Sequence, residues 1–417
     1  MNRVAVKNGC TLCFHSKRAL EFFSTVGDWW HHRRGFYSSL VAPQRQWLPP
    51  DIGDDPIKLG HWFFFMSLPM RVGINSDDAF RFMYELYLDN PDLFNPYTVM
   101  KISPKDVLAV VKKVARRIHP GGSQGDRKEG TFSYQSNQHS NIWVDNSARL
   151  VNFWGGDIRN VFWGITEFEE AFRRIDHERN PVGFRGMRRK IFSLLTMWLQ
   201  EFELIHKFPL PLIVDFHAIR LLLQLRILAV EYKPLGPGNS KREERMRPQS
   251  MWHYLAIRIT EKIVDEVIIW SQRFLMQHGL DPYDVGHGVW FLSRELCKNY
   301  YGNRSIERRL GKRRTVTERL ITDEELKSLS SWPANYRDPC QFCHVENMCK
   351  IRIPAGPYFD WGVMVNAGKH VTFPGRSEAL SVITRDMPVS FRRNGKRTSV
   401  SEPKSEIDDS LQGNLIF

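Results

Sequence analysis

The sequence has no apolar run that approaches the roughly 18 residues that a membrane-spanning helix needs. Its longest apolar stretches, such as residues 62–66, have the length of a core segment. The first residues, MNRVAVKNGCTLC, also lack the apolar region of a secretory signal. These absences predict a cytoplasmic protein without a transmembrane segment, in which disulfide bonds are disfavoured.

Cysteine is scarce, with 6 residues among 417, and it is absent between Cys13 and Cys297. Because an intracellular protein rarely relies on disulfides, the cysteines of the last third predict a metal or cluster site. These candidate ligands are Cys297, Cys340, Cys343 and Cys349. For Cys10 and Cys13 we expect two buried or unbound thiols, with a second metal site as the alternative.

Acidic residues are fewer than basic ones: the sequence has 46 Asp and Glu and 59 Lys and Arg, which gives a formal charge of +13. Such an excess favours a polyanionic partner, with nucleic acid ahead of an acidic membrane surface. It argues against a free nucleotide as the substrate. We expect a monomer that binds a nucleic-acid polymer.

Strand-like alternation is also scarce before the last sixty residues, so the pattern predicts an all-α main body without internal repeats. Residues 363–373, VMVNAGKHVTF, are the one candidate hairpin. The expected parts are an N-terminal extension (1–57), a helical core (58–290) with an insertion at about 119–145, a cysteine region with a basic insertion (291–352), and a C-terminal extension (353–417) that is disordered after about residue 391.

Several helices are predicted from their apolar faces and caps. One begins at Pro104 with Ser103 as its cap. A second buries a face at i, i+3, i+4, i+7 and i+8, and a third follows Asp215 as far as Val230. Residues 252–279 are predicted to be helical as well. The two faces consist of Ile191, Leu194, Leu195, Trp198 and Leu199, and of Ile219, Leu222, Leu223, Ile227 and Val230.

Asp215 stands between an apolar run, LPLIV, and the predicted helix. An ionised carboxylate is stabilised at a helix N-terminus and, when sheltered, interacts strongly with a cation. Cleavage of a base from its sugar develops positive charge on the sugar, which such a carboxylate would stabilise. The alternative is that Asp215 only caps its helix.

The residues around Asp215 carry a resemblance. VDFHAIR, from Val214 to Arg220, resembles the V-D-T-H-V-x-R signature of the helix-hairpin-helix (HhH-GPD) DNA glycosylases of the endonuclease III superfamily. GMRRK, from Gly186 to Lys190, resembles the G-V-G-R-K hairpin of that family. The spacing Cys340-x2-Cys343-x5-Cys349 resembles the last three ligands of its iron-sulfur loop, and FLSRELC resembles the helix that ends in the first ligand, here Cys297. The resemblance runs from about residue 58 to residue 352 and marks a divergent member.

The resemblance implies a two-lobed helix-hairpin-helix fold and a [4Fe-4S] cluster on the four cysteines, with zinc as the alternative. It implies that Asp215 is catalytic. Lys190 falls at the position of the nucleophile of bifunctional members, with a phosphate contact as the alternative. His217 is expected to be structural, and Arg220 to pair with an acid or a carbonyl. The expected DNA-binding residues are Gly183, Gly186, Arg188, Arg189, Met70 and Arg71.

Two positions depart from the family pattern. Arg188 replaces the second glycine of the hairpin, and Met70-Arg71 stand where the family places a polar wedge residue. The resemblance implies a DNA glycosylase that flips out and excises a damaged or modified base, as in base excision repair, with or without AP lyase activity. It implies double-stranded DNA as partner and nucleoid association. The alternatives are an N-glycosidase that acts on RNA or a modified nucleotide, and a non-catalytic nucleic-acid-binding iron-sulfur protein.

Overall fold

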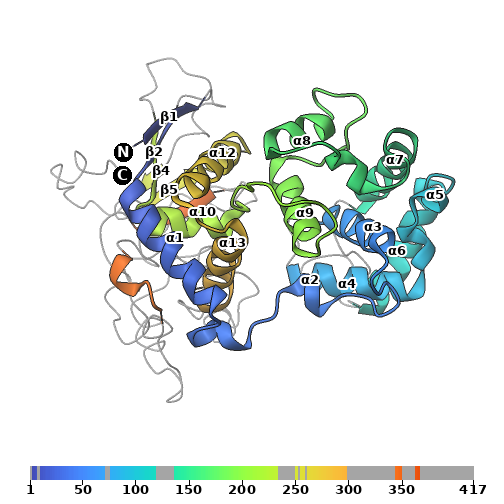
Figure 1. Cartoon of the computed structure of the whole chain (residues 1–417), viewed down its shortest axis with the longest axis horizontal. Helices are drawn as coiled ribbons and strands as arrows, with labels where there is room; N and C mark the ends of the chain where they lie inside the picture. Colours follow the sequence, from blue (N-terminus) through green and yellow to red (C-terminus); the bar gives the residue numbers. More distant parts are fainter. Residues whose placement is uncertain are drawn as a thin grey trace, which may run out of the picture. The chain divides into compact units, whose positions relative to one another are not determined.

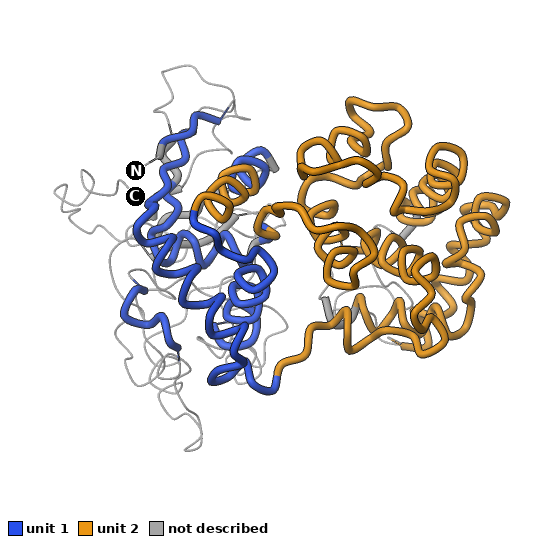
Figure 2. The backbone as a smooth tube through the Cα atoms, viewed as in Figure 1, with its two compact units in different colours: residues 1–39, 214–267, 278–417 blue, residues 40–213, 268–277 orange. Residues whose placement is uncertain are grey.

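The computed structural model describes residues 2–6, 10–70, 76–118, 136–232, 249–251, 254–258, 261–297, 343–349 and 362–366. These residues are mostly helical with a few short strands, as predicted for the main body (Figure 1). The chain divides into two compact units (Figure 2). Unit 1 comprises residues 1–39, 214–267 and 278–417, and unit 2 comprises residues 40–213 and 268–277.

Unit 2 is built from helices. They are α2 (Pro43–Gln46), α3 (Pro56–Ser67), α4 (Ser76–Asp89), η2 (Pro91–Phe94), α5 (Pro96–Val99), α6 (Pro104–Ile118), α7 (Ser136–Trp154), η3 (Ile158–Phe162), α8 (Phe168–Ile175), α9 (Arg189–Glu201) and part of α12 (Glu261–His278). Helix α6 begins at Pro104, and the Ser103 hydroxyl accepts from the N–H of Asp106 at 3.2 Å, which confirms the predicted cap.

Helix α3 forms the centre of the unit 2 core. The Asp55 carboxylate accepts from two first-turn N–H groups, and Pro56 suits the first helical position. Its aromatic run is buried on every side, as expected for a core segment. Phe65 stacks on Trp143 of α7 with ring centroids 5.2 Å apart, and Phe63 packs against Trp198 of α9.

The apolar face predicted for α9 is confirmed in most of its members. Ile191, Leu195, Trp198 and Leu199 are buried, whereas Leu194 is partly exposed. The insertion predicted at about 119–145 is helical in its last part, because α7 begins at Ser136, and Ser140 is buried. Residues 119–135 lie outside the described residues.

Unit 1 combines helices with two small sheets. Its elements are β1 (Asn2–Val6), β2 (Cys10–Phe14), α1 (Ser16–His31), η1 (Gly35–Ser39), α10 (Phe216–Gln224), β3 (Leu228–Tyr232), β4 (Gln249–Met251), β5 (Tyr254–Arg258), the remainder of α12, α13 (Pro282–Phe291), η4 (Leu292–Leu296), η8 (Glu346–Met348) and β6 (Gly362–Asn366). Within the described part of the chain, no helix is both long and apolar enough to cross a membrane.

Helices α1 and α13 pack together closely. A Cβ atom added to Gly288 would lie 2.5 Å from the carbonyl oxygen of Val26, so this contact requires a glycine. Trp30 of α1 stacks on His287 and Phe291 of α13, with ring centroids 5.0 and 4.8 Å apart. The first 39 residues, expected to belong to an extension, therefore contribute core side chains to unit 1.

The strands correct two helix predictions. Helix α10 ends at Gln224, and Arg226 adopts φ +53°, a left-handed conformation that interrupts a helix. The next residues form β3, which pairs antiparallel with β2 so that Cys10 lies opposite Tyr232 and Cys13 opposite Ala229. Cys13 is buried in this sheet. Residues 254–258, expected to be helical, form β5 between β4 and β6.

The predicted core and C-terminal extension differ from the observed division of the chain or lie partly outside the described residues. The expected core, residues 58–290, is divided between the two units. Residues 362–366 form a strand that overlaps the start of the stretch that suggested a hairpin, and its partner is β5. The residues from 367 onward, including the predicted disordered tail, lie outside the described residues.

Candidate functional site

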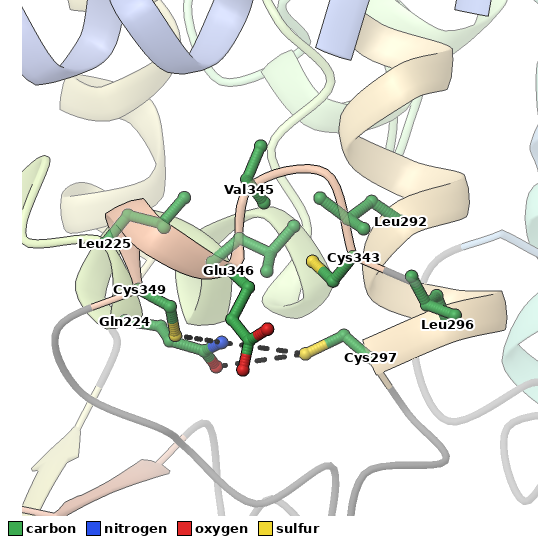
Figure 3. A pocket seen from close by; sticks show the side chains of 10 residues that line it. Gln224, Leu225, Leu292, Leu296, Cys297, Cys343, Val345, Glu346 and Cys349 are labelled. Atoms are coloured by element: carbon green, nitrogen blue, oxygen red, sulfur yellow. Dashed lines mark hydrogen bonds between the residues drawn. The ribbon is translucent and has the colours of Figure 1, made fainter. Parts of the chain in front are cut away.

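Folding brings three of the four predicted cysteine ligands to one pocket in unit 1. Cys297 directly follows η4, and Cys343 and Cys349 flank the short helix η8. The pocket has a volume of about 30 Å³ (Figure 3). This volume is larger than the volume that a single water molecule needs. It is lined by Leu221, Gln224, Leu225, Leu292, Leu296, Cys297, Cys343, Val345, Glu346 and Cys349. Cys340 lies outside the described residues.

Helix α10 directs nitrogen donors at the thiol sulfurs. The Gln224 Nε2 atom lies 3.1 Å from the Sγ of Cys349 and 3.7 Å from the Sγ of Cys297. The Arg220 Nη1 atom lies 3.5 Å from the Sγ of Cys297. Figure 3 shows the amide of Gln224 between the two sulfurs. Donors of this kind stabilise negative charge on sulfur.

Electrostatic interactions between the thiols change the pKa of Cys343. Burial raises the pKa of the Cys343 thiol to about 12, and charges on Cys297 and Cys349 raise it as well. Negative charges on three neighbouring thiolates repel each other, and a bound cation offsets this repulsion. Thiolates are the ligands that zinc and iron-sulfur clusters prefer. The donor set therefore fits such a group, although no three His, Cys, Asp or Glu side chains among the described residues already form a metal-binding group.

Asp215 is the N-cap residue of α10. Its Oδ1 atom accepts a hydrogen bond from the N–H of Ala218 at 3.0 Å, so the carboxylate caps the helix. The side chain is partly exposed, and Ala218 is its hydrogen-bond partner within the described residues. A capping carboxylate keeps its charge and its second oxygen, so capping and catalysis are compatible.

Arg220 and His217 are both linked to Ser293 of η4. Arg220 is fully buried, and its Nη2 atom donates to the carbonyl oxygen of Ser293 at 2.7 Å, as expected for a carbonyl partner. The Ser293 hydroxyl lies 3.3 Å from the Nδ1 atom of His217 and donates to the His217 carbonyl oxygen at 3.1 Å. These contacts give His217 the structural role that was predicted.

The cysteine loop is anchored by α1 and η1. His344 stacks on Trp29 with ring centroids 4.1 Å apart and an interplanar angle of 11°, and it meets the edge of Tyr37 at 5.5 Å. Burial lowers the pKa of His344 to about 4, so its ring is neutral at neutral pH. The hydroxyl of Tyr37 donates to the Gly288 carbonyl oxygen at 2.8 Å. The N-terminal segment thereby fixes the loop that carries Cys343 and Cys349.

The glycines of the predicted hairpin lie in unit 2. Gly186 adopts φ +73°, which favours glycine. Gly183 is buried, and its N–H donates to the carbonyl oxygen of Asn180 at 2.9 Å. A Cβ atom on Gly183 would lie 2.4 Å from the carbonyl oxygen of Ile175. The N–H of Gly183, which was predicted to bind DNA, is thus used inside the turn, and this glycine permits close backbone packing.

The basic residues of the hairpin differ in their surroundings. Arg188 is exposed, pairs with Glu178 at 2.9 Å and is the N-cap residue of α9 without a side-chain cap. Arg189 is 11% exposed, forms an ion pair with Glu169 and lies over the ring of Phe172. Arg189, predicted to bind DNA, is therefore largely occupied by contacts inside unit 2.

The other predicted residues of unit 2 are placed as follows. Lys190 is the second residue of α9 and is partly buried. Met70 is partly exposed in the turn after α3, and its N–H donates to the carbonyl oxygen of Ser67. Arg71 lies outside the described residues.

Two residues of the site were missed at the level of sequence. Gln224 follows Arg220 by four residues, so the two polar side chains share one face of a helix that is rich in apolar residues. That spacing was the sequence signal that could have identified Gln224. No such signal identifies Ser293, because a serine within an apolar segment is common.

A scan against models of protein families gives no match to this chain, and a search of curated proteins also gives none.

Proposed function

We propose that this chain is a DNA glycosylase that excises a damaged or modified base and carries an iron-sulfur cluster on Cys297, Cys340, Cys343 and Cys349. The observation that carries the proposal is the construction of α10. Asp215 caps its first turn, whereas Arg220 and Gln224 direct nitrogen atoms at the sulfurs of Cys297 and Cys349. One helix thus joins the proposed catalytic acid to the proposed ligands.

Asp215 supplies the charge that the reaction needs. As the bond between the sugar carbon and the base nitrogen breaks, the base leaves with the bonding electrons and the sugar becomes cationic. The carboxylate of Asp215 stabilises that cation, and water adds to the sugar carbon and loses a proton. The hydrogen bond from Ala218 holds one carboxylate oxygen in place.

The start of α9 supports binding of the DNA backbone. Arg188 leaves its helix N-terminus without a side-chain cap, and the first N–H groups of a 13-residue helix favour an anion. The exposed Arg188 guanidinium is itself suited to a phosphate oxygen. Met70 and Arg71 keep their proposed role beside the displaced base.

Lys190 is the proposed nucleophile of an additional AP lyase activity. Its amine would attack the sugar carbon in place of water and form a Schiff base, which leads to strand cleavage. Borohydride trapping tests this role directly, since a reduced Schiff base links protein to DNA covalently. Lys190→Gln should abolish the cross-link, and a wild-type protein that releases a base without cross-linking would be a monofunctional glycosylase.

Cys297 after η4, and Cys343 and Cys349 on either side of η8, would hold the cluster together with Cys340, and its binding would stabilise unit 1. Its presence is tested by the visible absorption of the anaerobically purified protein and by iron and sulfide analysis. Cys343→Ala should abolish the absorption. A colourless wild-type protein with stoichiometric zinc would contradict an iron-sulfur cluster.

The base that is excised need not be identified before the glycosylase activity is tested. Wild type and Asp215→Asn are incubated with natural, oxidised, alkylated and phage-modified DNA, and released bases are identified by mass spectrometry. Asparagine caps a helix as well as aspartate does, so this variant removes the charge and keeps the fold. Release by wild type alone is the expected result.

The contrary outcome is equally specific. Salt-sensitive binding to DNA without release of any base would overturn the glycosylase proposal, because phosphate contacts produce such binding on their own. Release from RNA alone would identify the N-glycosidase of the same fold.

A further inference from the structure

We infer that Gln224 is a ligand-positioning residue of the cysteine site, which sets the reduction potential of the bound cluster and slows its loss. The inference rests on the proposed cluster, and it concerns a side chain for which the resemblance implies no role. Gln224 stands at the last position of α10, directly before the chain leaves the helix.

The geometry of the amide carries the inference. Its Nε2 atom lies 3.1 Å from Cys349 Sγ and 3.7 Å from Cys297 Sγ. The thiol of Cys297 in turn lies 3.9 Å from the Oε1 atom of the same amide. One side chain therefore bridges two ligands that come from different segments, the end of η4 and the loop around η8.

Burial makes this bridge effective. Gln224 is 6% exposed and Cys349 is 8% exposed, so little water competes for the sulfur. An amide N–H donor in such a place stabilises the more negative state of the sulfur ligands. Hydrogen bonds to the sulfurs are among the factors that set cluster potentials, and they favour the reduced state.

The two N–H groups of one amide can also donate to two thiolates at once. This arrangement keeps Cys297 and Cys349 oriented toward the same point before the metal arrives. Residues that orient metal ligands typically change metal affinity about 10- to 100-fold when they are replaced.

The test compares Gln224→Met, Gln224→Glu and wild type in the anaerobically purified full-length protein. Methionine keeps the approximate shape and lacks the amide, whereas glutamate keeps the shape and adds a negative charge. The reduction potential should fall in the order wild type, Gln224→Met, Gln224→Glu. Cluster absorption should decay about 10-fold faster or more in both variants under a chelator.

Gln200→Met is the matched control. Gln200 is also a buried glutamine, and its amide donates to the Phe208 carbonyl oxygen at 3.2 Å within unit 2. This variant loses an amide of the same kind, so its cluster potential and decay should equal those of wild type. Far-UV circular dichroism verifies that all variants are folded.

The outcomes separate this inference from the proposed function. Wild type that holds a cluster, together with an unchanged potential and decay in Gln224→Met and Gln224→Glu, would overturn the inference and leave the cluster in place. Wild type without iron after anaerobic reconstitution would overturn both. Equal changes of the cluster potential and decay in Gln200→Met and Gln224→Met would also overturn the inference, because Gln224 would then act only through the general stability of the fold.

Discussion

One nitrogen of Arg220 holds Ser293 by two hydrogen bonds, since Nη2 lies 2.7 Å from both the carbonyl oxygen and the Oγ atom of Ser293. Both partners are fully buried, so no water replaces these bonds when the guanidinium is removed. We expect Arg220→Met to lower the free energy of unfolding by about 3 kcal/mol, within the range for hydrogen bonds to a charged group. Urea denaturation measures this change.

Arg34→Met is the control for Arg220→Met. Arg34 forms an ion pair with Asp28 at 2.7 Å in the same unit, and both side chains are about half exposed. Exposed ion pairs contribute about 0–1 kcal/mol, so the control should remain close to wild type. An Arg220→Met variant as stable as the control would show that the buried bonds add nothing to stability.

The two roles of Asp215 are separable by substitution. Asp215→Ala removes the cap of α10 and should lower the free energy of unfolding by about 1 kcal/mol. Asp215→Asn should remain within a few tenths of a kcal/mol of wild type, since Asn caps as well as Asp. Both variants should lack base release. Residual release by Asp215→Asn at the rate of wild type would restrict Asp215 to capping.

Two glycines of α13 should respond in opposite directions to the same substitution. A Cβ atom on Gly286 meets nothing within 4 Å, whereas a Cβ atom on Gly288 meets the backbone of Val26 at 2.5 Å. Gly286→Ala should raise the free energy of unfolding by about 0.5–1 kcal/mol, as expected for a glycine inside a helix. Gly288→Ala should lower it by about 1–3 kcal/mol, because α1 and α13 must move apart. Thermal denaturation of both variants compares the two, and equal shifts would contradict the close packing.

His61 predicts a dependence of stability on pH. Burial lowers its pKa below the ordinary value of 6.5, and its Nε2–H donates to the Gly156 carbonyl oxygen at 2.7 Å. The unfolded chain therefore binds a proton more readily than the folded chain, so stability present above about pH 6.5 is lost as the pH falls. Urea denaturation at about pH 7 and about pH 5 should show a smaller decrease for His61→Gln than for wild type. Equal decreases would assign the acid sensitivity to other groups.

The helices could be predicted where the local signal is strong. Ser103 before Pro104 predicts the start of α6, and the apolar spacing from Ile191 predicts the buried face of α9. The strands could not, because the apolar residues of β3, such as Val230, continue the helical spacing of the apolar face of α10. What divides them is the left-handed conformation of Arg226 and the pairing of β3 with β2, which is remote in sequence.

The same distinction applies to the site. The spacing around Cys343 and Cys349 predicts that these two residues act together, and folding brings Cys297 to the same pocket. Sequence could not assign the internal partners of Arg189, since Glu169 and Phe172 reach it only through the packing of α8 against the hairpin. Nor could it show that the N–H of Gly183 is used within its own turn.

The pairing of Cys10 in β2 with Tyr232 in β3 has a consequence for biosynthesis. The central strand of this sheet leaves the ribosome long before its second neighbour exists, because 222 residues separate the two positions (232 − 10). At about 5–20 residues per second, synthesis of that interval takes roughly 10–45 s. During this time one edge of β2 is unpaired, and such an edge can pair with another chain. The nascent chain is therefore exposed to aggregation through β2, and delayed synthesis upstream of residue 232 should increase its dependence on chaperones.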